Sequence, residues 1–181
     1  MPNTITPYQK YEFKAHKTYF LDNNIWIALF APLINSNQDR QRKASSFLKN
    51  IQSYNSQIAL ISLIVSEFTN TSTRFFFNLW KNNTQNYSAD YKKDYKQNTS
   101  SSYENDLSEV KIMLEKICNL DFVEKYPDNF NAVNIDNIIN NFEIDFNDAY
   151  YLELCRKNNW ILVTSDNDFH NIDCNITIVK I

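Results

Sequence analysis

The sequence has 181 residues and contains no glycine. Several common motifs need glycine where the backbone turns tightly or approaches a ligand closely. Its absence therefore excludes the phosphate-binding loop of nucleoside triphosphatases, the glycine-rich turn of dinucleotide-binding folds, the nucleophile elbow of α/β-hydrolases and the calcium loop of EF-hands. Turns that require a positive φ must use asparagine, the next most permissive residue.

Cysteine and long apolar runs are also scarce. The three cysteines are widely spaced and include no CxxC pair, so we expect neither a disulfide framework nor a zinc site, and a reducing cytoplasm as the compartment. The longest apolar runs, such as 58–61 and 63–65, are far shorter than the roughly 20 residues that cross a bilayer. The N-terminus lacks a basic segment followed by an apolar one, so we predict no secretory signal and no membrane partner.

Neither sign of charge dominates, because 18 Lys and Arg residues face 21 Asp and Glu residues and leave a net charge of −3. This balance excludes a histone-like, highly basic nucleic-acid binder, although a local basic patch is compatible with it. Apolar residues make up 43% of the chain and aromatic residues 15%, which suffices for one core. Length and composition predict a single domain over residues 1–181.

Short, continuous apolar runs predict buried strands at residues 18–21, 58–61, 160–163 and 176–181. Apolar residues at helical spacing predict helices at 25–34, 39–54, from 62 onward, from 104 onward, 136–141 and 145–158. Strands of this kind that alternate with helices are typical of a parallel sheet covered on both faces, which is an α/β fold. Residues 1–17 carry little pattern, and we expect them to form an arm or a short helix.

Residues 81–105 differ from the rest of the chain, because they consist of Asn, Ser, Lys and Tyr with hardly an aliphatic residue. We expect an inserted loop or a partly ordered excursion here. Tyr87, Tyr91 and Tyr95 alternate with three lysines, and such aromatic and basic side chains bind unpaired bases and phosphates. A solvated loop or an oligomer contact is the alternative, because two aspartates dilute the positive charge.

Acidic residues follow the predicted strands at the end where parallel sheets bind ligands. Asp22 comes directly after the first strand, and Glu67 comes one helical turn after the second. Asp166 and Asp168 follow the third strand, and the helix that leads into that strand begins with Asp148. Carboxylates from distant parts of the chain are thus predicted to converge at one edge of the sheet.

Convergence of carboxylates is costly, because two bare negative charges about 4 Å apart repel by roughly 4 kcal/mol at an effective dielectric constant of about 20. A divalent cation removes this cost, and an all-oxygen ligand set selects Mg²⁺ or Mn²⁺. Such an ion neutralises charge on a phosphate and activates water. The pattern therefore predicts hydrolysis of a phosphodiester without a protein nucleophile.

Each acid also has a purely structural interpretation. Asp22 could cap the helix that follows it, and Glu67 could be a surface charge on its helix. Asp148 could form a capping pair with Asp145, three residues earlier, and residues 166–168 could form a polar turn. Their joint placement at one sheet edge is what favours a site over these separate roles.

Four short motifs in order along the chain carry a resemblance to a known family: LDNNI at 21–25, SEF at 66–68, NDA at 147–149 and LVTSDNDF at 162–169. Together with their strand and helix context, they make the sequence similar to PIN domains, which include the toxin subunits of VapBC-type toxin–antitoxin pairs. The resemblance covers most of the chain. It departs from the family in Asn23, where Thr or Ser is frequent, and in the extra length that residues 81–105 add.

The resemblance implies a three-layer α/β/α fold with a central parallel sheet and endoribonuclease cleavage of RNA. It implies that Mg²⁺ or Mn²⁺ would be held by Asp22, Glu67, Asp148 and Asp166, with Asp168 assisting from the outer shell. It also implies an RNA substrate and an antitoxin protein as partners.

Asn24, Arg74 and Ser165 are candidates for substrate contact. Arg74 lies seven residues after Glu67 on the same helical face, where it could neutralise a phosphate, and a structural ion pair with Glu67 or an aspartate is the alternative. The aromatic run 75–77 cannot all face inward, so one ring is expected to meet a partner such as a dimer mate or an antitoxin.

Two alternatives to an RNA-cleaving enzyme stay open. The first keeps the nuclease chemistry but directs it at DNA or at phage nucleic acid in host defence. The second is a non-catalytic PIN scaffold that binds RNA or a partner protein, with its acidic residues in capping roles.

Overall fold

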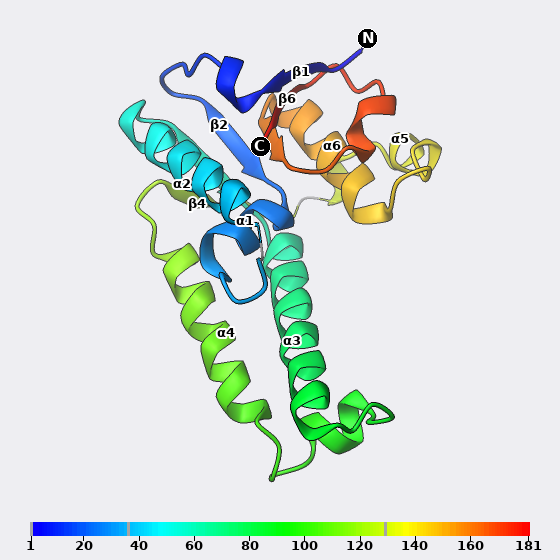
Figure 1. The fold of residues 1–181 in the computed structure, drawn as a ribbon. Coiled ribbons are helices and arrows are strands. Elements are labelled where there is room, and N and C mark those ends of the chain that lie inside the picture. The colour runs from blue at the N-terminus through cyan, green and yellow to red at the C-terminus, as the bar shows by residue number, and fades with distance from the viewer. Residues whose placement is uncertain (1, 36, 129) are drawn as a thin grey trace.

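The computed structural model describes residues 2–35, 37–128 and 130–181, and a six-stranded sheet lies at its centre (Figure 1). All neighbouring strands are parallel, in the order β1-β6-β5-β2-β3-β4. The strands are β1 (Thr4–Pro7), β2 (Thr18–Leu21), β3 (Gln57–Leu60), β4 (Val123–Lys125), β5 (Ile161–Thr164) and β6 (Thr177–Lys180). The expected α/β fold with a parallel sheet is confirmed.

Helices cover both faces of this sheet. They are α1 (Asn23–Phe30), α2 (Gln38–Ser53), α3 (Ser62–Thr84), α4 (Tyr103–Cys118), α5 (Ile135–Asn140) and α6 (Phe146–Asn158). Shorter helical segments are η1 (Tyr8–Lys10), η2 (Tyr91–Lys96), η3 (Phe130–Ala132) and η4 (Asp168–Asn171). The chain moves one way across the sheet from β2 to β4 and then back to β5, so right-handed crossovers place α1 to α4 on one face and α5 and α6 on the other (Figure 1). Within the described ranges, no helix is long and apolar enough to span a membrane.

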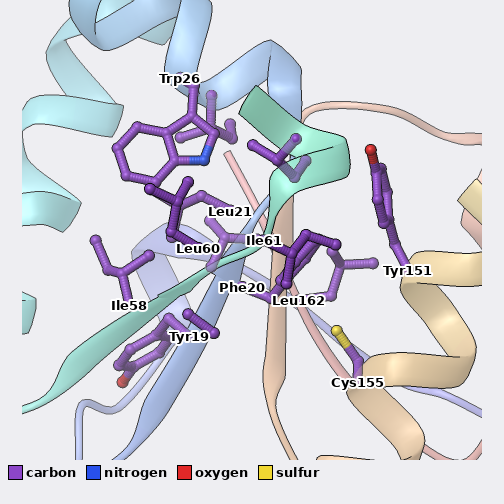
Figure 2. Packing of buried hydrophobic residues seen from close by; sticks show 14 of the residues in the cluster. Tyr19, Phe20, Leu21, Trp26, Ile58, Leu60, Ile61, Tyr151, Cys155 and Leu162 are labelled. Carbon is purple, nitrogen blue, oxygen red and sulfur yellow. The ribbon is translucent and has the colours of Figure 1, made fainter. Parts of the chain in front are cut away.

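The central strand β2 is apolar along its length because its two faces are both covered. Successive side chains of a strand point to opposite faces. Tyr19 meets Phe47 of α2 at a ring-centroid distance of 5.3 Å, whereas Phe20 meets Tyr151 of α6 at 5.0 Å. Figure 2 shows Phe20 and Leu162, which are register partners on β2 and β5, beside Tyr151.

The two edge strands were not predicted from the sequence. Residues 1–17 were expected to form an arm or a short helix, but residues 4–7 form β1, which pairs with β6. At the other edge, β4 pairs with β3 and exposes Glu124 and Lys125. An edge strand has one neighbour and an open side, so it needs no continuous apolar run, and the pattern that identifies the inner strands is absent.

The segment 81–105 has more regular structure than a loop, which corrects that expectation. Helix α3 continues to Thr84 and ends at Gln85, whose φ is 54°. A π-helical segment, η2, follows, and its N-cap residue Asp90 accepts hydrogen bonds from the backbone N–H groups of Lys92 and Lys93. Helix α4 then returns alongside α3, and the two project from the sheet as an antiparallel pair (Figure 1).

Tyr95 anchors this segment instead of stacking on RNA. Its side chain is 1% exposed, and its hydroxyl donates a hydrogen bond to Asp106 at 2.6 Å. The rings in contact with it are those of Phe77, Trp80, Tyr91 and Tyr103. The predicted RNA-stacking role is therefore wrong for Tyr95, because its ring is not accessible. The same cluster explains the 75–77 run in part, since Phe77 packs on its own chain.

Asparagine replaces glycine at several tight turns, as the glycine-free composition predicts. Among the described residues, positive φ angles occur at His16, Asn55, Gln85, Asn159 and Asn175. Asn159, with φ 53°, ends α6 directly before β5, so the turn that sets up the third predicted strand depends on an asparagine.

We predict that Asn3→Ala destabilises the fold. Asn3 fastens β1 to the segment before β6, because its Nδ2 donates to the Ile172 carbonyl at 2.5 Å and its Oδ1 accepts from the Cys174 N–H at 3.0 Å. Loss of these bonds should lower the free energy of unfolding by about 1–3 kcal/mol in urea titrations. Asn83→Ala, at an exposed position of α3, is the control and should leave stability unchanged or slightly higher. Equal midpoints for the two variants would contradict the prediction.

Candidate active site

The candidate site lies where the strand order reverses. Strands β2 and β5 are neighbours, but the chain continues from β2 toward β3 and from β5 toward β6, on opposite sides. Parallel α/β sheets bind ligands at such a point, beyond the carboxyl ends of the strands. Asp22 directly follows β2 and Thr164 ends β5, so both residues lie at this position.

Asp22 is held in place by two neutral side chains. It is 6% exposed, and its Oδ2 accepts hydrogen bonds from the Thr164 hydroxyl at 2.6 Å and from Nδ2 of Asn24 at 2.5 Å. Asn24 also accepts the backbone N–H of Ser165 at 3.1 Å, which ties the start of α1 to the loop after β5. Asn24 thus positions Asp22, and substrate contacts of Asn24 and Ser165 stay predictions.

Glu67 on α3 accepts hydrogen bonds from α6, a helix on the opposite face of the sheet. It lies in the second turn of α3, and its Oε2 accepts from the Tyr151 hydroxyl at 2.6 Å and from Nδ2 of Asn147 at 3.5 Å. Both donors lie on α6, so α3 and α6 meet over this sheet edge. Burial, followed by the hydrogen bond to Glu67, raises the pKa of Tyr151, which keeps it a donor. The sequence analysis missed Tyr151, although its place three residues after Asp148 puts both on one helix face.

Asp148 experiences the negative charge of the other acids most strongly. Asp145 is the N-cap of α6 and accepts the Asp148 backbone N–H at 3.0 Å, so the capping alternative holds for the backbone and does not use the Asp148 carboxylate. Burial, with added repulsion from nearby carboxylates, raises the pKa of Asp148 to about 8. Those carboxylates, in decreasing order of effect, are Asp22, Asp145, Glu67 and Asp166.

Asp22 shows the same effect more weakly. Burial raises its pKa to about 6, against the hydrogen bond from Thr164, which favours the charged form, and the charge of Glu67 adds to the rise. Acids that are distant in sequence therefore lie within electrostatic range of one another at this edge.

Asp166 and Asp168 also form the polar turn that was the structural alternative. Asp166 donates its backbone N–H to the Thr164 hydroxyl at 2.9 Å, and its Oδ1 accepts the backbone N–H of Asp168 at 3.1 Å. Both side chains are exposed. The turn does not remove Asp166 from the site, because its charge still contributes to the raised pKa of Asp148.

Lys180 is a neighbour of the acids that the sequence analysis missed. It ends β6 and is the register partner of Thr164, so it lies at the same edge one strand further along. Its Nζ is buried and has no hydrogen-bond partner among the described residues. Burial lowers the pKa of Lys180, and the charges of Asp166, Asp168 and Asp22 oppose this effect. The rule that found the acids, a search of strand ends, would also have found this lysine.

Arg74 lies outside the cluster of acids. It is seven residues beyond Glu67 on α3, which is two helical turns or about 10 Å. Its side chain is exposed, and in the ranges that the structure describes it forms no ion pair. The alternative interpretation, a structural pair with Glu67 or an aspartate, therefore finds no support in this part of the chain.

The oxygen atoms of these carboxylates are ligands that suit a hard divalent cation. Asp22, Glu67 and Asp166 act electrostatically on Asp148, so carboxylates from several elements gather at this edge, and Lys180 lies within electrostatic range of Asp22 and Asp166. As the side chains stand, no three His, Cys, Asp or Glu residues of the described chain form a group close enough to share one ion. Binding a cation would therefore require these carboxylates to turn toward one another.

Comparisons with known proteins agree with this fold. A family model described as PIN domain matches residues 19–174. A chain in the crystal structure of VapBC2 from Rickettsia felis, bound to a DNA fragment from their promoter, is similar with a TM-score of 0.51 and 17% sequence identity. The alignment covers 90% of this chain and 98% of that chain. At this identity the likeness supports the fold. Among curated proteins, none matches the chain.

We predict that Asp22 and Asp148 contribute less and less to the stability of the metal-free protein as the pH rises from about 4 to about 8. The unfolded chain releases aspartate protons near a pKa of about 3.9, whereas the folded protein holds them up to a pKa of about 6 at Asp22 and about 8 at Asp148. Because the folded state binds more protons in this window, these two groups stabilise it less as the pH increases.

Asp148→Asn should remove the upper part of this dependence, because the amide cannot ionise. Melting temperatures measured in EDTA at pH 5, 6, 7 and 8 test it, with Asp121→Asn, an exposed position, as the control that follows the wild type. A melting curve series for Asp148→Asn that falls as steeply as the wild type between pH 6 and 8 would disprove the assignment.

Proposed function

The chain belongs to the PIN domain family, and from this premise we propose that it is a metal-dependent endoribonuclease that hydrolyses phosphodiester bonds of RNA. One observation carries the proposal. Carboxylates that follow β2 and β5 and that lie on α3 and α6 are within electrostatic range of one another at this edge of the sheet, where burial, followed by their repulsion, raises the pKa of Asp148 to about 8. Such crowding of negative charge is unfavourable for stability, so a cation is the ligand that it suits best.

The ligands of Mg²⁺ or Mn²⁺ in this proposal are Asp22, Glu67, Asp148 and Asp166, with Asp168 further out. When bound, the ion neutralises charge on the phosphate and makes water a stronger nucleophile. The all-oxygen donor set favours these hard ions over zinc or copper.

The other residues at the edge serve to orient the acids. Thr164 and Asn24 fix Asp22 through the hydrogen bonds to its Oδ2, and Tyr151 fixes Glu67 from the opposite face. Lys180, whose Nζ is buried beside these acids, offsets part of their negative charge at this edge. Residues that hold ligands in this way are typical of metal sites and contribute to affinity.

We further propose that the protein is the toxin of a toxin–antitoxin pair in the cytoplasm. The support is the PIN family match together with the fold likeness to a chain of VapBC2. An antitoxin protein would then be the partner, and co-expression with the product of a neighbouring small reading frame should suppress the growth defect that the chain causes alone. DNA as the substrate is the competing proposal, since the family match does not separate the two nucleic acids.

We predict that Asp22→Asn abolishes RNA cleavage. The substitution removes a charged oxygen from the proposed ligand set, so the rate should fall by at least about 100-fold in the presence of Mg²⁺ or Mn²⁺. Cleavage of labelled RNA and of DNA of the same sequence is measured for wild type, Asp22→Asn and the exposed control Asp121→Asn, each with and without EDTA.

We expect the wild type and Asp121→Asn to cleave RNA, and we expect EDTA to stop this cleavage. Equal cleavage by Asp22→Asn would eliminate the proposed site. Preferential cleavage of DNA would show that DNA, not RNA, is the substrate. If the wild type cleaved neither nucleic acid, the result would favour a non-catalytic binding scaffold.

We also predict a role for Lys180 that can be measured without turnover. Lys180→Met keeps an unbranched side chain, one atom shorter, but removes the charge that faces the acids. Mn²⁺ should therefore bind roughly 10-fold more tightly by calorimetry, because the carboxylates lose a competing cation. Unchanged Mn²⁺ affinity would show that the lysine has no part in the site.

A further inference from the structure

A pocket of about 350 Å³ lies between α3 and η2, away from the cluster of acids. Its lining residues are Asn70, Thr73, Arg74, Phe77, Asn78 and Tyr91. Five of them lie on α3, and Tyr91 is contributed by η2, the segment that leaves the end of α3 (Figure 1). The segment 81–105 therefore builds a wall of this pocket.

The wall that η2 provides is held firmly to α3. The ring of Tyr91 meets the ring of Phe77 edge to face at 5.3 Å with an interplanar angle of 86°. Tyr95, buried one turn further along η2, fixes the segment through its hydrogen bond to Asp106. Asp90 and Asp94 are both used to close the first turn of η2, since Asp94 accepts the Asp90 N–H at 2.7 Å.

The lining combines flat aromatic surface, amide groups and one cation. Phe77 and Tyr91 are half-buried, whereas Asn70, Asn78 and Arg74 are exposed. No carboxylate lines the pocket, and Lys81 places its Nζ 5.1 Å from the centre of the Phe77 ring. These features suit a ligand that is planar, aromatic, polar at its edge and joined to a negative charge, which describes a nucleotide.

The pocket is aligned with the acids along one helix. Asn70 and Arg74 follow Glu67 by three and seven residues and so lie on the same face of α3. A strand whose phosphate lies at the proposed metal site beside Glu67 can therefore pass along α3, meet Arg74 about two turns away and place a base beyond it.

We propose that the pocket between α3 and η2 binds one unpaired base of the RNA substrate, with Tyr91 as the stacking surface and Arg74 on the adjoining phosphate. The proposal rests on the proposed nuclease function and adds a subsite, built by η2, that binds a base at a fixed distance from the cut. Asn70 and Asn78 would bond to the edge of that base.

The test uses the full chain and a set of single-stranded RNAs that each carry one abasic position. Binding is measured in EDTA, where the proposed cleavage does not proceed, and cleavage is measured in Mn²⁺. The wild type should lose at least about fivefold in affinity at one abasic position, at a constant distance from the cut, because one stacked base contributes about 1–3 kcal/mol.

Three variants identify the residues that read this position. Tyr91→Leu keeps an apolar side chain but removes the ring, and Arg74→Gln removes the charge of an exposed helix residue. Both should weaken binding of intact RNA by at least about fivefold, and Tyr91→Leu should abolish the penalty of the abasic position. Tyr54→Leu, at a tyrosine that is 43% exposed and lies outside both the pocket and the segment 81–105, is the control with wild-type affinity.

The outcomes separate the two levels of the proposal. The pocket proposal would be contradicted if the wild type cleaved RNA without any penalty at an abasic position. It would also be contradicted if both pocket variants bound and cleaved RNA like the wild type. Either result would leave the proposed nuclease function unaffected. A wild type that neither binds nor cleaves RNA overturns both. Loss of binding to an antitoxin protein by Arg74→Gln with unchanged RNA binding would make the pocket a protein-docking surface and would contradict the inference.

Discussion

The main constraint on the site is the repulsion among the carboxylates that lie between β2 and β5, where the strand order reverses. The apolar strands β2 and β5 fix where Asp22 and the loop after Thr164 must lie, and the helices on the two faces bring Glu67 and Asp148 to the same edge. Burial, followed by repulsion from the neighbouring acids, disfavours the charged form of Asp148 in the metal-free folded chain, where its pKa rises to about 8.

The hydrogen bonds around the acids stabilise their negative charge despite this repulsion. Neutral donors, the Thr164 hydroxyl and the Tyr151 hydroxyl, reach Asp22 and Glu67 from β5 and from α6. They stabilise charge without cancelling it, so the site stays negative. Lys180 is the exception, and its position beside Thr164 makes the strand ends a place where charges of both signs meet.

The inner part of the fold could be predicted from the sequence because both faces of the inner strands are covered. That environment leaves continuous apolar runs such as residues 18–21, which the structure places within one residue of the predictions. The edge strands could not be found in this way, since β1 and β4 each have an open side. The segment 81–105 was misjudged because its packing relies on tyrosine, and an aromatic cluster such as the one around Tyr95 leaves no aliphatic pattern.

The acids of the candidate site were proposed from the sequence on a different basis, and their role as ligands stays a prediction. A topological rule, that ligands bind at carboxyl ends of parallel strands, needs only strand positions and the residue that follows each strand. Tyr151 was not accessible to this rule, because its contact with Glu67 depends on how α6 crosses over the sheet. The base-binding pocket likewise depends on the path of η2, which the sequence did not reveal.

The central claim is that Asp22, Glu67, Asp148 and Asp166 share one divalent cation. The most direct measurement is anomalous X-ray scattering from crystals grown with Mn²⁺. The account predicts a peak among these four carboxylates, with their oxygens about 2.0–2.3 Å from the ion. A peak elsewhere on the molecule, or no peak at this edge at saturating Mn²⁺, would contradict it.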